Sequence, residues 1–250
     1  MEDSGEKQKL IEKLQKLAHK LEKSPTVKDV RESNLFSTEY KLTDRFGSFN
    51  EAKRIAGIEV IEENTNNINK DIQKDSDLAY LLGVLAGDGS IVELANGSFR
   101  LSLTCKDQEM LEEFTSIAEE KFGIKGSKQV QYADGKKYPR VDFCSRDFNK
   151  VLGDWSFENW HLRLRREFHW VYHEYSEDFL SGLFDAEGTV CGNRIKIYCQ
   201  NMEGSRVIEE MLENLGMEYS SNKNSVYILR NSFEDFKNKI NPRISRKVIK

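Results

Sequence analysis

The sequence of 250 residues predicts an α+β fold in which a small all-helical domain precedes two related units. Three observations predict it. Leucines repeat at helical spacing near the start, two later apolar segments end in an acidic residue followed by glycine, and a strictly alternating segment follows each of these. Because motifs that return in the same order indicate duplicated structure, we expect two pseudo-symmetric units, each with the element order αββαββα.

The all-helical domain is expected over residues 1–60. Its first helix covers residues 7–23, where leucine occupies positions 10, 14, 17 and 21 of one face. Ser24-Pro25-Thr26 ends that helix and caps the next one. Residues 38–57 indicate two more helices, joined at Gly47 because glycine tolerates the left-handed conformation found at helix ends.

A polar segment separates this domain from the rest of the chain. Residues 62–67 read EENTNN and contain no apolar side chain, as is typical of a linker. We place a linker over residues 61–75 and a second domain over residues 76–250. The second domain divides into repeats at residues 76–175 and 176–250.

Each repeat is expected to open with an apolar helix. Residues 76–89 read SDLAYLLGVLAGDG, and residues 176–188 read SEDFLSGLFDAEG. Because serine and acidic residues are favoured at a helix start, we expect the serine to cap each helix. One acid-glycine ending would most simply be a helix stop. Two matched copies favour a functional pair, formed by Asp88 and Glu187.

The remaining elements follow in the same order in both repeats. Residues 100–106 (RLSLTCK) and 194–200 (RIKIYCQ) alternate strictly, which predicts half-buried strands. An amphipathic helix and a further strand come next, at 108–122 and 141–144 in the first repeat and at 203–215 and 226–229 in the second. The second repeat lacks most of the basic hairpin at 128–140 and the aromatic helix at 155–175, so we expect the units to differ in size.

Charge is distributed unevenly along the chain. The formal net charge is −4, which argues weakly against a nucleic acid as partner. Residues 121–140 nevertheless hold six basic side chains against one acidic, and residues 237–250 hold six against none. Such runs are also typical of plain solvated faces. Neither a membrane-spanning apolar stretch nor a signal peptide is present, so we expect an intracellular protein of the cytoplasm or nucleoid.

Small residues line one face of both motif helices: Gly83, Ala86, Gly87, Gly182 and Ala186. They would let the two helix backbones approach closely. Packed side by side, the helices would bring Asp88 and Glu187 together at their C-terminal ends, where the helix dipole favours a cation. Two carboxylates with few other strong ligands nearby suit Mg²⁺, which keeps several waters and binds substrate phosphate.

Two parts of the chain resemble known families. Residues 81–89 (LLGVLAGDG) and 180–188 (LSGLFDAEG) resemble the two signature helices of a monomeric LAGLIDADG homing endonuclease. Their acidic residues lie 99 positions apart, which fits one repeat of that family. Residues 7–58, with Arg45-Phe46-Gly47-Ser48-Phe49-Asn50-Glu51-Ala52, resemble the small helical repeat associated with homing endonucleases.

These resemblances imply an activity. The two β-sheets would form a saddle over DNA, and a monomer would hydrolyse phosphodiesters of both strands across the minor groove, as a site-specific endonuclease. Mg²⁺ is the implied cofactor, with Mn²⁺ or Ca²⁺ able to replace it for binding. The implied partner is double-stranded DNA with a long, pseudo-asymmetric target site, as in intron homing. The helical domain would add a helix-turn-helix-like DNA contact.

The resemblance also implies the site residues. It assigns four residues to the metal centre: Asp88, Glu187, and the backbone carbonyls of Gly87 and Ala186. It assigns catalysis to the same two acids and to Lys106 and Gln200, which lie at strand ends. For Lys106 and Gln200, an ordinary solvent-facing position at a strand end is the alternative. Asp185 is expected to be structural.

Strand alternation gives each sheet one polar face, which would lie toward the DNA. The candidate DNA-binding residues are Arg100, Ser102, Thr104, Arg194, Lys196, Tyr198, Lys128, Gln129, Gln131, Lys136 and Arg140. Such side chains contact phosphates and base edges. His169 and His173 have a spacing compatible with metal binding, but the aromatic residues around them favour a packing role.

Two other functional classes stay open. A catalytically silent DNA-binding regulator or an RNA maturase would use the same saddle without cleavage, and a protein-interaction module would carry the motifs by accident. The intact pair of acids favours the endonuclease. Intein splicing residues do not flank the sequence, so we expect a free-standing polypeptide.

Overall fold

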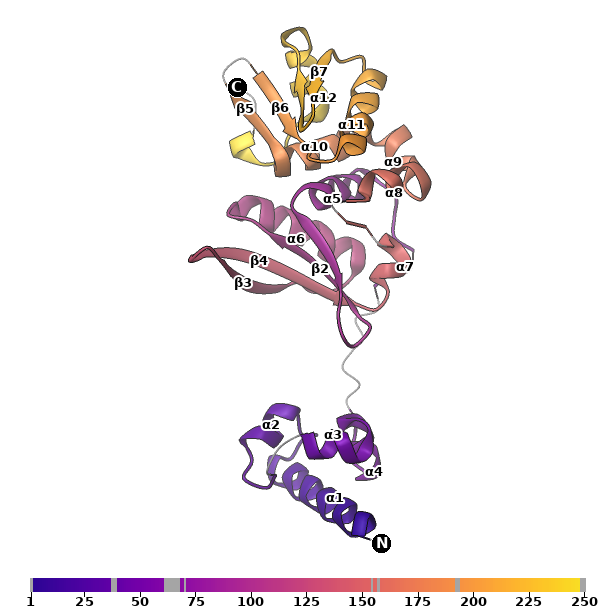
Figure 1. The fold of residues 1–250 in the computed structure, drawn as a ribbon, viewed down its shortest axis with the longest axis vertical. Helices are drawn as coiled ribbons and strands as arrows, with labels where there is room; N and C mark the ends of the chain where they lie inside the picture. The colour runs from indigo at the N-terminus through magenta and orange to yellow at the C-terminus, as the bar shows by residue number, and fades with distance from the viewer. Residues whose placement is uncertain are drawn as a thin grey trace. The chain divides into compact units, whose positions relative to one another are not determined.

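A computed structural model describes residues 2–36, 40–60, 68–69, 71–153, 155–156, 158–191 and 194–247. The chain divides into two compact units, residues 1–65 and 66–250 (Figure 1). Each unit has a hydrophobic core of its own. Within the described residues, no helix combines the length and apolar character that crossing a membrane requires.

Helices alone form the described part of the first unit: α1 (Glu2–Leu21), α2 (Val27–Glu32), α3 (Tyr40–Phe46) and α4 (Phe49–Ile55). The side chain of Thr26 accepts a hydrogen bond from the backbone of Asp29, whose carboxylate accepts one from the backbone of Thr26, so the pair caps α2. Gly47 has a φ of 79°, and Ser48 caps α4. Leucines of α1 share one hydrophobic core with Leu42 of α3 and Ala52 of α4. The predicted all-helical fold is confirmed.

The second unit contains two repeats of one pattern. The first repeat consists of α5 (Ser76–Gly87), β1 (Gly89–Glu93), β2 (Phe99–Thr104), α6 (Gln108–Phe122), β3 (Ser127–Ala133), β4 (Lys136–Ser145) and α7 (Phe148–Leu152). The connecting helices are α8 (Trp160–Arg166) and α9 (His169–Glu174). The second repeat consists of α10 (Ser176–Glu187), β5 (Gly188–Cys191), β6 (Arg194–Tyr198), α11 (Met202–Asn214), β7 (Tyr219–Asn222), β8 (Ser225–Ile228) and α12 (Phe233–Ile240). The predicted order αββαββα is confirmed.

Each repeat forms an antiparallel sheet of four strands, in the orders β1-β2-β4-β3 and β5-β6-β8-β7. The registers match, since Gly89 of β1 pairs with Leu103 and Gly188 of β5 pairs with Ile197. The apolar side chains of both alternating segments face the core, since Leu101, Leu103, Ile195 and Ile197 are buried. In both repeats, therefore, the residue after the motif acid begins an edge strand at the same place.

A continuous core joins the two repeats. Helices α5 and α10 lie side by side between the two sheets (Figure 1). Both helices are buried along most of their length. This burial explains why α5 is apolar on nearly every face. The segment between the repeats contributes the buried Trp155 and Trp160 to the same core.

The structure corrects two expectations at the start of the repeats. Ile68 is 3% exposed and the Asn69 amide donates to the carbonyl of Lys121, so the chain joins the second unit before the predicted linker ends. Asp75 caps α5 by accepting from the backbone of Leu78, and Ser76 lies inside the helix. The Ser176 hydroxyl donates to the carbonyl of Tyr172, a residue that precedes α10. Ser176 therefore does not cap the start of α10. A carboxylate before Ser76 is the stronger acceptor for backbone amides.

Candidate metal and nucleic-acid site

Helices α5 and α10 touch backbone to backbone. A Cβ added at Gly83 would collide with the carbonyl oxygen of Phe179, and one at Gly182 would collide with the carbonyl oxygen of Tyr80. Glycine is therefore required at both positions, because any side chain would push the helices apart. The expectation that small residues permit a close approach is confirmed for this pair.

The two motif acids end the paired helices. A Cβ at Gly87 would lie 2.6 Å from the Cβ of Ala186 and 2.9 Å from the Cγ of Glu187, so the last turns of α5 and α10 are in contact. Asp88 is the C-cap of α5 and is exposed, whereas Glu187 is the last residue of α10 and is half-buried. The fold thus brings together the two carboxylates that the sequence paired across a separation of 99 residues.

The electrostatics of this acid pair favour a cation. Burial and, after it, the negative charge of Asp88 raise the pKa of Glu187 to about 7, while the charge of Lys247 acts in the opposite direction. The carbonyl oxygens of the last helical turn, including those of Gly87 and Ala186, have no donor further along their own helix. Hard oxygen donors with partial or full negative charge converge at this place, which is the donor set that Mg²⁺ and Ca²⁺ prefer.

The remaining donors around the acid pair are few. In the described part of the chain, no three or more His, Cys, Asp or Glu side chains are grouped as they would be in an all-protein metal cage. An ion held here would keep water or phosphate oxygens in its other positions, as hydrated Mg²⁺ does. The residues present therefore fit a divalent ion that takes further oxygen ligands from outside the protein.

Asp185 takes a separate place, two residues before Glu187. It is fully buried, and its carboxylate accepts hydrogen bonds from the hydroxyl of Tyr80 (2.9 Å) and the backbone amide of Arg243 (2.9 Å). Burial raises its pKa to about 6. Its bonds join α5, α10 and the C-terminal segment, which agrees with the structural role expected for it.

The strand-end candidates Lys106 and Gln200 are both exposed. The Lys106 ammonium lies 5.3 Å from the centre of the Tyr138 ring, on the first sheet. Gln200 follows β6 at the corresponding position of the second repeat. Their expected catalytic role stays a prediction.

Most of the predicted DNA-binding residues of the first repeat share one face of its sheet. Pairing between β2, β3 and β4 puts six of them together: Arg100, Ser102, Thr104, Gln129, Gln131 and Arg140, with Lys136 at the end of the same face. Lys128 pairs with the buried Val141, on the opposite face that α6 covers. The pleat explains the difference, since neighbouring residues of a strand point to opposite sides.

Arg140 organises that face. Its guanidinium donates to the Ser102 hydroxyl (2.7 Å), to Asp142 (2.5 Å) and to Gln131 (3.2 Å). Ser102 is 2% exposed, so it supports Arg140 from below and does not face solvent as expected. The Thr104 hydroxyl donates to the same Gln131 amide oxygen (3.1 Å). Asp142, which the sequence did not single out, is recognisable only once β2 and β4 are paired.

The second sheet presents an equivalent polar face. Arg194, Lys196 and Tyr198 lie on it in alternation along β6. The Lys196 ammonium lies 5.7 Å from the ring centre of Tyr198 and 6.0 Å from that of Tyr227, which β8 places directly opposite. Tyr227 lies in the strand predicted at residues 226–229, and it was missed because only the pairing of β6 with β8 puts it opposite Lys196.

The structure corrects the interpretation of the two helical histidines. His169 and His173 are exposed, with ring centres 6.5 Å apart, and it is Trp170 and Val171 of α9 that are buried. A packing role for the histidines is therefore wrong. The helix turns its other face to the core.

Comparison with known proteins agrees with this architecture. A family model described as a LAGLIDADG-like domain matches residues 75–152 and 174–241, more than half of the chain. The chain belongs to this family. A second model, the homing endonuclease associated repeat, matches residues 6–59, which is the helical unit. Both resemblances inferred from the sequence motifs are confirmed.

Two uncharacterized proteins of Methanocaldococcus jannaschii are similar in sequence. One is 30% identical over 174 residues, which cover 64% of this chain and 62% of that protein. The other is 26% identical over 162 residues, which cover 61% of this chain and 55% of that protein. The chain thus matches less than two thirds of the length of these relatives.

Solved structures share the fold. I-DmoI in complex with DNA and Ca superposes with a TM-score of 0.50 and 20% identity, covering 71% of this chain and 91% of that one. I-WcaI, a homing endonuclease bound to its DNA recognition sequence, superposes with a TM-score of 0.55 and 17% identity, covering 79% of this chain and 97% of that one. At these identities the likeness concerns the fold.

Proposed function

We propose that the chain is a site-specific DNA endonuclease that hydrolyses phosphodiesters of both strands across the minor groove. The observation that carries this proposal is the meeting of Asp88 and Glu187 at the ends of α5 and α10, between two sheets with polar faces. A binding module would have no need of two carboxylates at helix C-termini, where the dipole disfavours negative charge. A monomer suffices, because one chain carries both acids.

Asp88 and Glu187 would hold a divalent ion, assisted by the carbonyls of Gly87 and Ala186. When bound, such an ion activates water and neutralises the charge that develops on the phosphate. Glu187 has to be ionised for this task, and the charge of Lys247 favours its ionised form. We take Mg²⁺ as the working ion, with Mn²⁺ and Ca²⁺ as substitutes for binding; the related fold of I-DmoI has been solved with DNA and Ca and with DNA and Mn.

The two polar sheet faces would hold the DNA. Arg100, Arg140, Arg194 and Lys196 supply positive charge on them, and Gln129 and Gln131 supply amides that pair with base edges. Double-stranded DNA with a long target of unequal halves is the substrate that two unequal repeats fit. The helical unit would add further DNA contacts, as a helix-turn-helix-like module.

Substitution of either acid tests the proposal. Target sites are first selected from a randomised duplex library by cleavage with Mg²⁺. Asp88→Asn and Glu187→Gln each remove one charge with little change of shape, and we expect cleavage to fall by about a thousandfold or more while DNA affinity is kept. Glu234→Gln, an exposed acid on α12, is the matched control and should cut normally.

Normal cutting by both acid variants would refute this mechanism. Tight binding of selected DNA without any cutting, in Mg²⁺ or Mn²⁺, would instead indicate a DNA-binding regulator or a maturase on the same fold. The absence of salt-dependent DNA affinity would point to a protein-interaction module.

A further inference from the structure

Residues 241–247, here called the strap, follow α12 and cross from the second repeat to the first. The Ser181 hydroxyl of α10 donates to the carbonyl of Asn241 (3.1 Å), and the backbone amide of Arg243 donates to Asp185 (2.9 Å). Asn241 has a φ of 41°, which turns the chain away from the axis of α12. The first residues of the strap are therefore hydrogen-bonded to α10, the helix that ends in Glu187.

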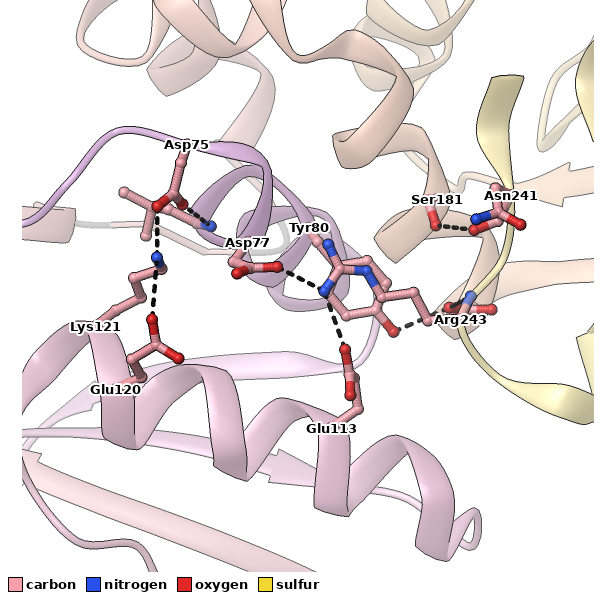
Figure 2. Close-up of polar contacts among 11 residues, drawn as sticks. Asp75, Asp77, Tyr80, Glu113, Glu120, Lys121, Ser181, Asn241 and Arg243 are labelled. Atoms are coloured by element: carbon pink, nitrogen blue, oxygen red, sulfur yellow. Dashed lines mark hydrogen bonds and ion pairs between the residues drawn. The ribbon is translucent and has the colours of Figure 1, made fainter. Parts of the chain in front are cut away.

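Two strap residues fasten it to the first repeat. The Arg243 guanidinium donates to Asp77 (2.8 Å) and Glu113 (3.0 Å) and lies 4.2 Å from the ring centre of Tyr80; Figure 2 shows it between these residues of α5 and α6. The backbone amide and hydroxyl of Ser245 both donate to Glu109 of α6, at 2.9 and 2.6 Å. These bonds fix the direction in which the rest of the strap runs.

The strap carries Lys247 to the acid pair. This lysine is 7% exposed, and its backbone amide donates to the carbonyl of Ile244 (2.8 Å). Its ammonium donates to the carbonyl oxygen of Gly188, the residue directly after Glu187, and lies 5.7 Å from the ring centre of Phe184. A lysine is rarely buried unless its charge is compensated. Here the compensating charges are those of Glu187 and Asp185, together with the negative end of the α10 dipole.

We propose that Lys247 is a positioning residue of the cleavage centre, which holds the Gly188 carbonyl and sets the charge that an incoming divalent ion meets. This inference rests on the proposed function. The hydrogen bond fixes the backbone next to Glu187, and cleavage needs such groups held closely in place. The ammonium also repels a second cation, so it weakens metal binding. At a pH high enough to ionise Glu187 with or without Lys247, removing the ammonium should therefore strengthen metal binding and slow cleavage.

The test compares three variants of the full chain at one mildly alkaline pH. Lys247→Met removes the charge and the hydrogen bond, and Lys247→Arg keeps both. Lys150→Met removes an exposed positive charge of α7 by the same change and is the control. Binding of Ca²⁺ alone is measured by isothermal titration calorimetry, cleavage of a selected target by single-turnover kinetics with Mg²⁺, and folding by thermal melting.

For Lys247→Met we expect Ca²⁺ binding tighter by about threefold and cleavage slower by about tenfold, with unchanged DNA affinity. Lys247→Arg and Lys150→Met should resemble the unsubstituted chain in both assays. Loss of Ca²⁺ affinity in parallel with a lower melting temperature would mean that Lys247 only stabilises the fold, and it would overturn the inference. Unchanged Ca²⁺ binding and cleavage would overturn it as well, with the proposed function left standing. An unsubstituted chain that neither binds Ca²⁺ nor cuts DNA would overturn both.

Discussion

At the scale of single residues, the two motif acids differ in their surroundings. Asp88 is exposed at the end of α5, whereas Glu187 is half-buried and has a raised pKa. Both lie at a helix C-terminus, so each is opposed by its own dipole. The pair is therefore poised for a cation but not symmetric, and we expect the two DNA strands to be cut at different rates.

The raised pKa of Glu187 predicts how stability depends on pH. Its value is about 7 in the folded chain, against an ordinary value of 4.5, so the folded state binds this proton more tightly than the unfolded state. The stabilisation is complete below about pH 4.5 and is lost as pH rises through about 7. We expect about 1–3 kcal/mol to be lost over this range, reduced by solvent screening of the half-buried side chain.

Urea unfolding of the metal-free chain across this pH range measures the effect. Glu187→Gln should flatten the dependence, because the amide does not titrate, and Ca²⁺ should restore stability at the upper end by binding the ionised pair. Equal pH profiles for the two proteins would contradict the burial of Glu187.

At the scale of secondary-structure elements, the α5–α10 pair holds the site together. Gly83 and Gly182 each face backbone of the other helix. We expect Gly83→Ala to destabilise the second unit by about 3 kcal/mol, since the helices have to separate. Gly5→Ala, in α1, would place its Cβ in open space and should be neutral or slightly stabilising.

Thermal unfolding of both variants checks this expectation. Gly83→Ala should also weaken Ca²⁺ binding, because the displaced helix ends no longer bring Asp88 and Glu187 together. A stable Gly83→Ala variant with full Ca²⁺ affinity would show that the helix contact is looser than the structure indicates.

At the scale of the whole molecule, we propose that one face of each sheet binds the DNA. Arg140 and Lys128 lie in the same hairpin of the first repeat, but on opposite faces. We expect Arg140→Met to weaken DNA binding by about tenfold and to lower its salt dependence. Lys128→Met removes the same charge from the helix-covered face and should have a much smaller effect.

Fluorescence anisotropy over a range of salt concentrations distinguishes the two variants. Equal losses of affinity would mean that overall charge, and not the polar face, governs binding. A larger loss for Lys128→Met would put the DNA on the other side of the hairpin.

Much of this molecule is encoded locally, in spacing and in short motifs. The element order, the helix stop and cap at Gly47 and Ser48, and the two acid-ended helices all follow from patterns a few residues long. The acid pair was predictable because its motif occurs twice and small residues accompany both copies. Family resemblance extended these patterns to a function.

Tertiary structure alone decided the rest, because burial depends on partners distant in the chain. Ser102 reads as a solvent-facing strand residue until Arg140, 38 positions away, covers it. His169 and His173 read as core residues until α9 turns its tryptophan inward. Lys247 was one lysine in a basic tail, and only the anchoring of Arg243 and Ser245 on the first repeat brings its charge beside Glu187. The periodicity of a sequence indicates which residues lie on the same face of a helix or strand. Long-range packing determines whether that face contacts the core, another side chain or solvent.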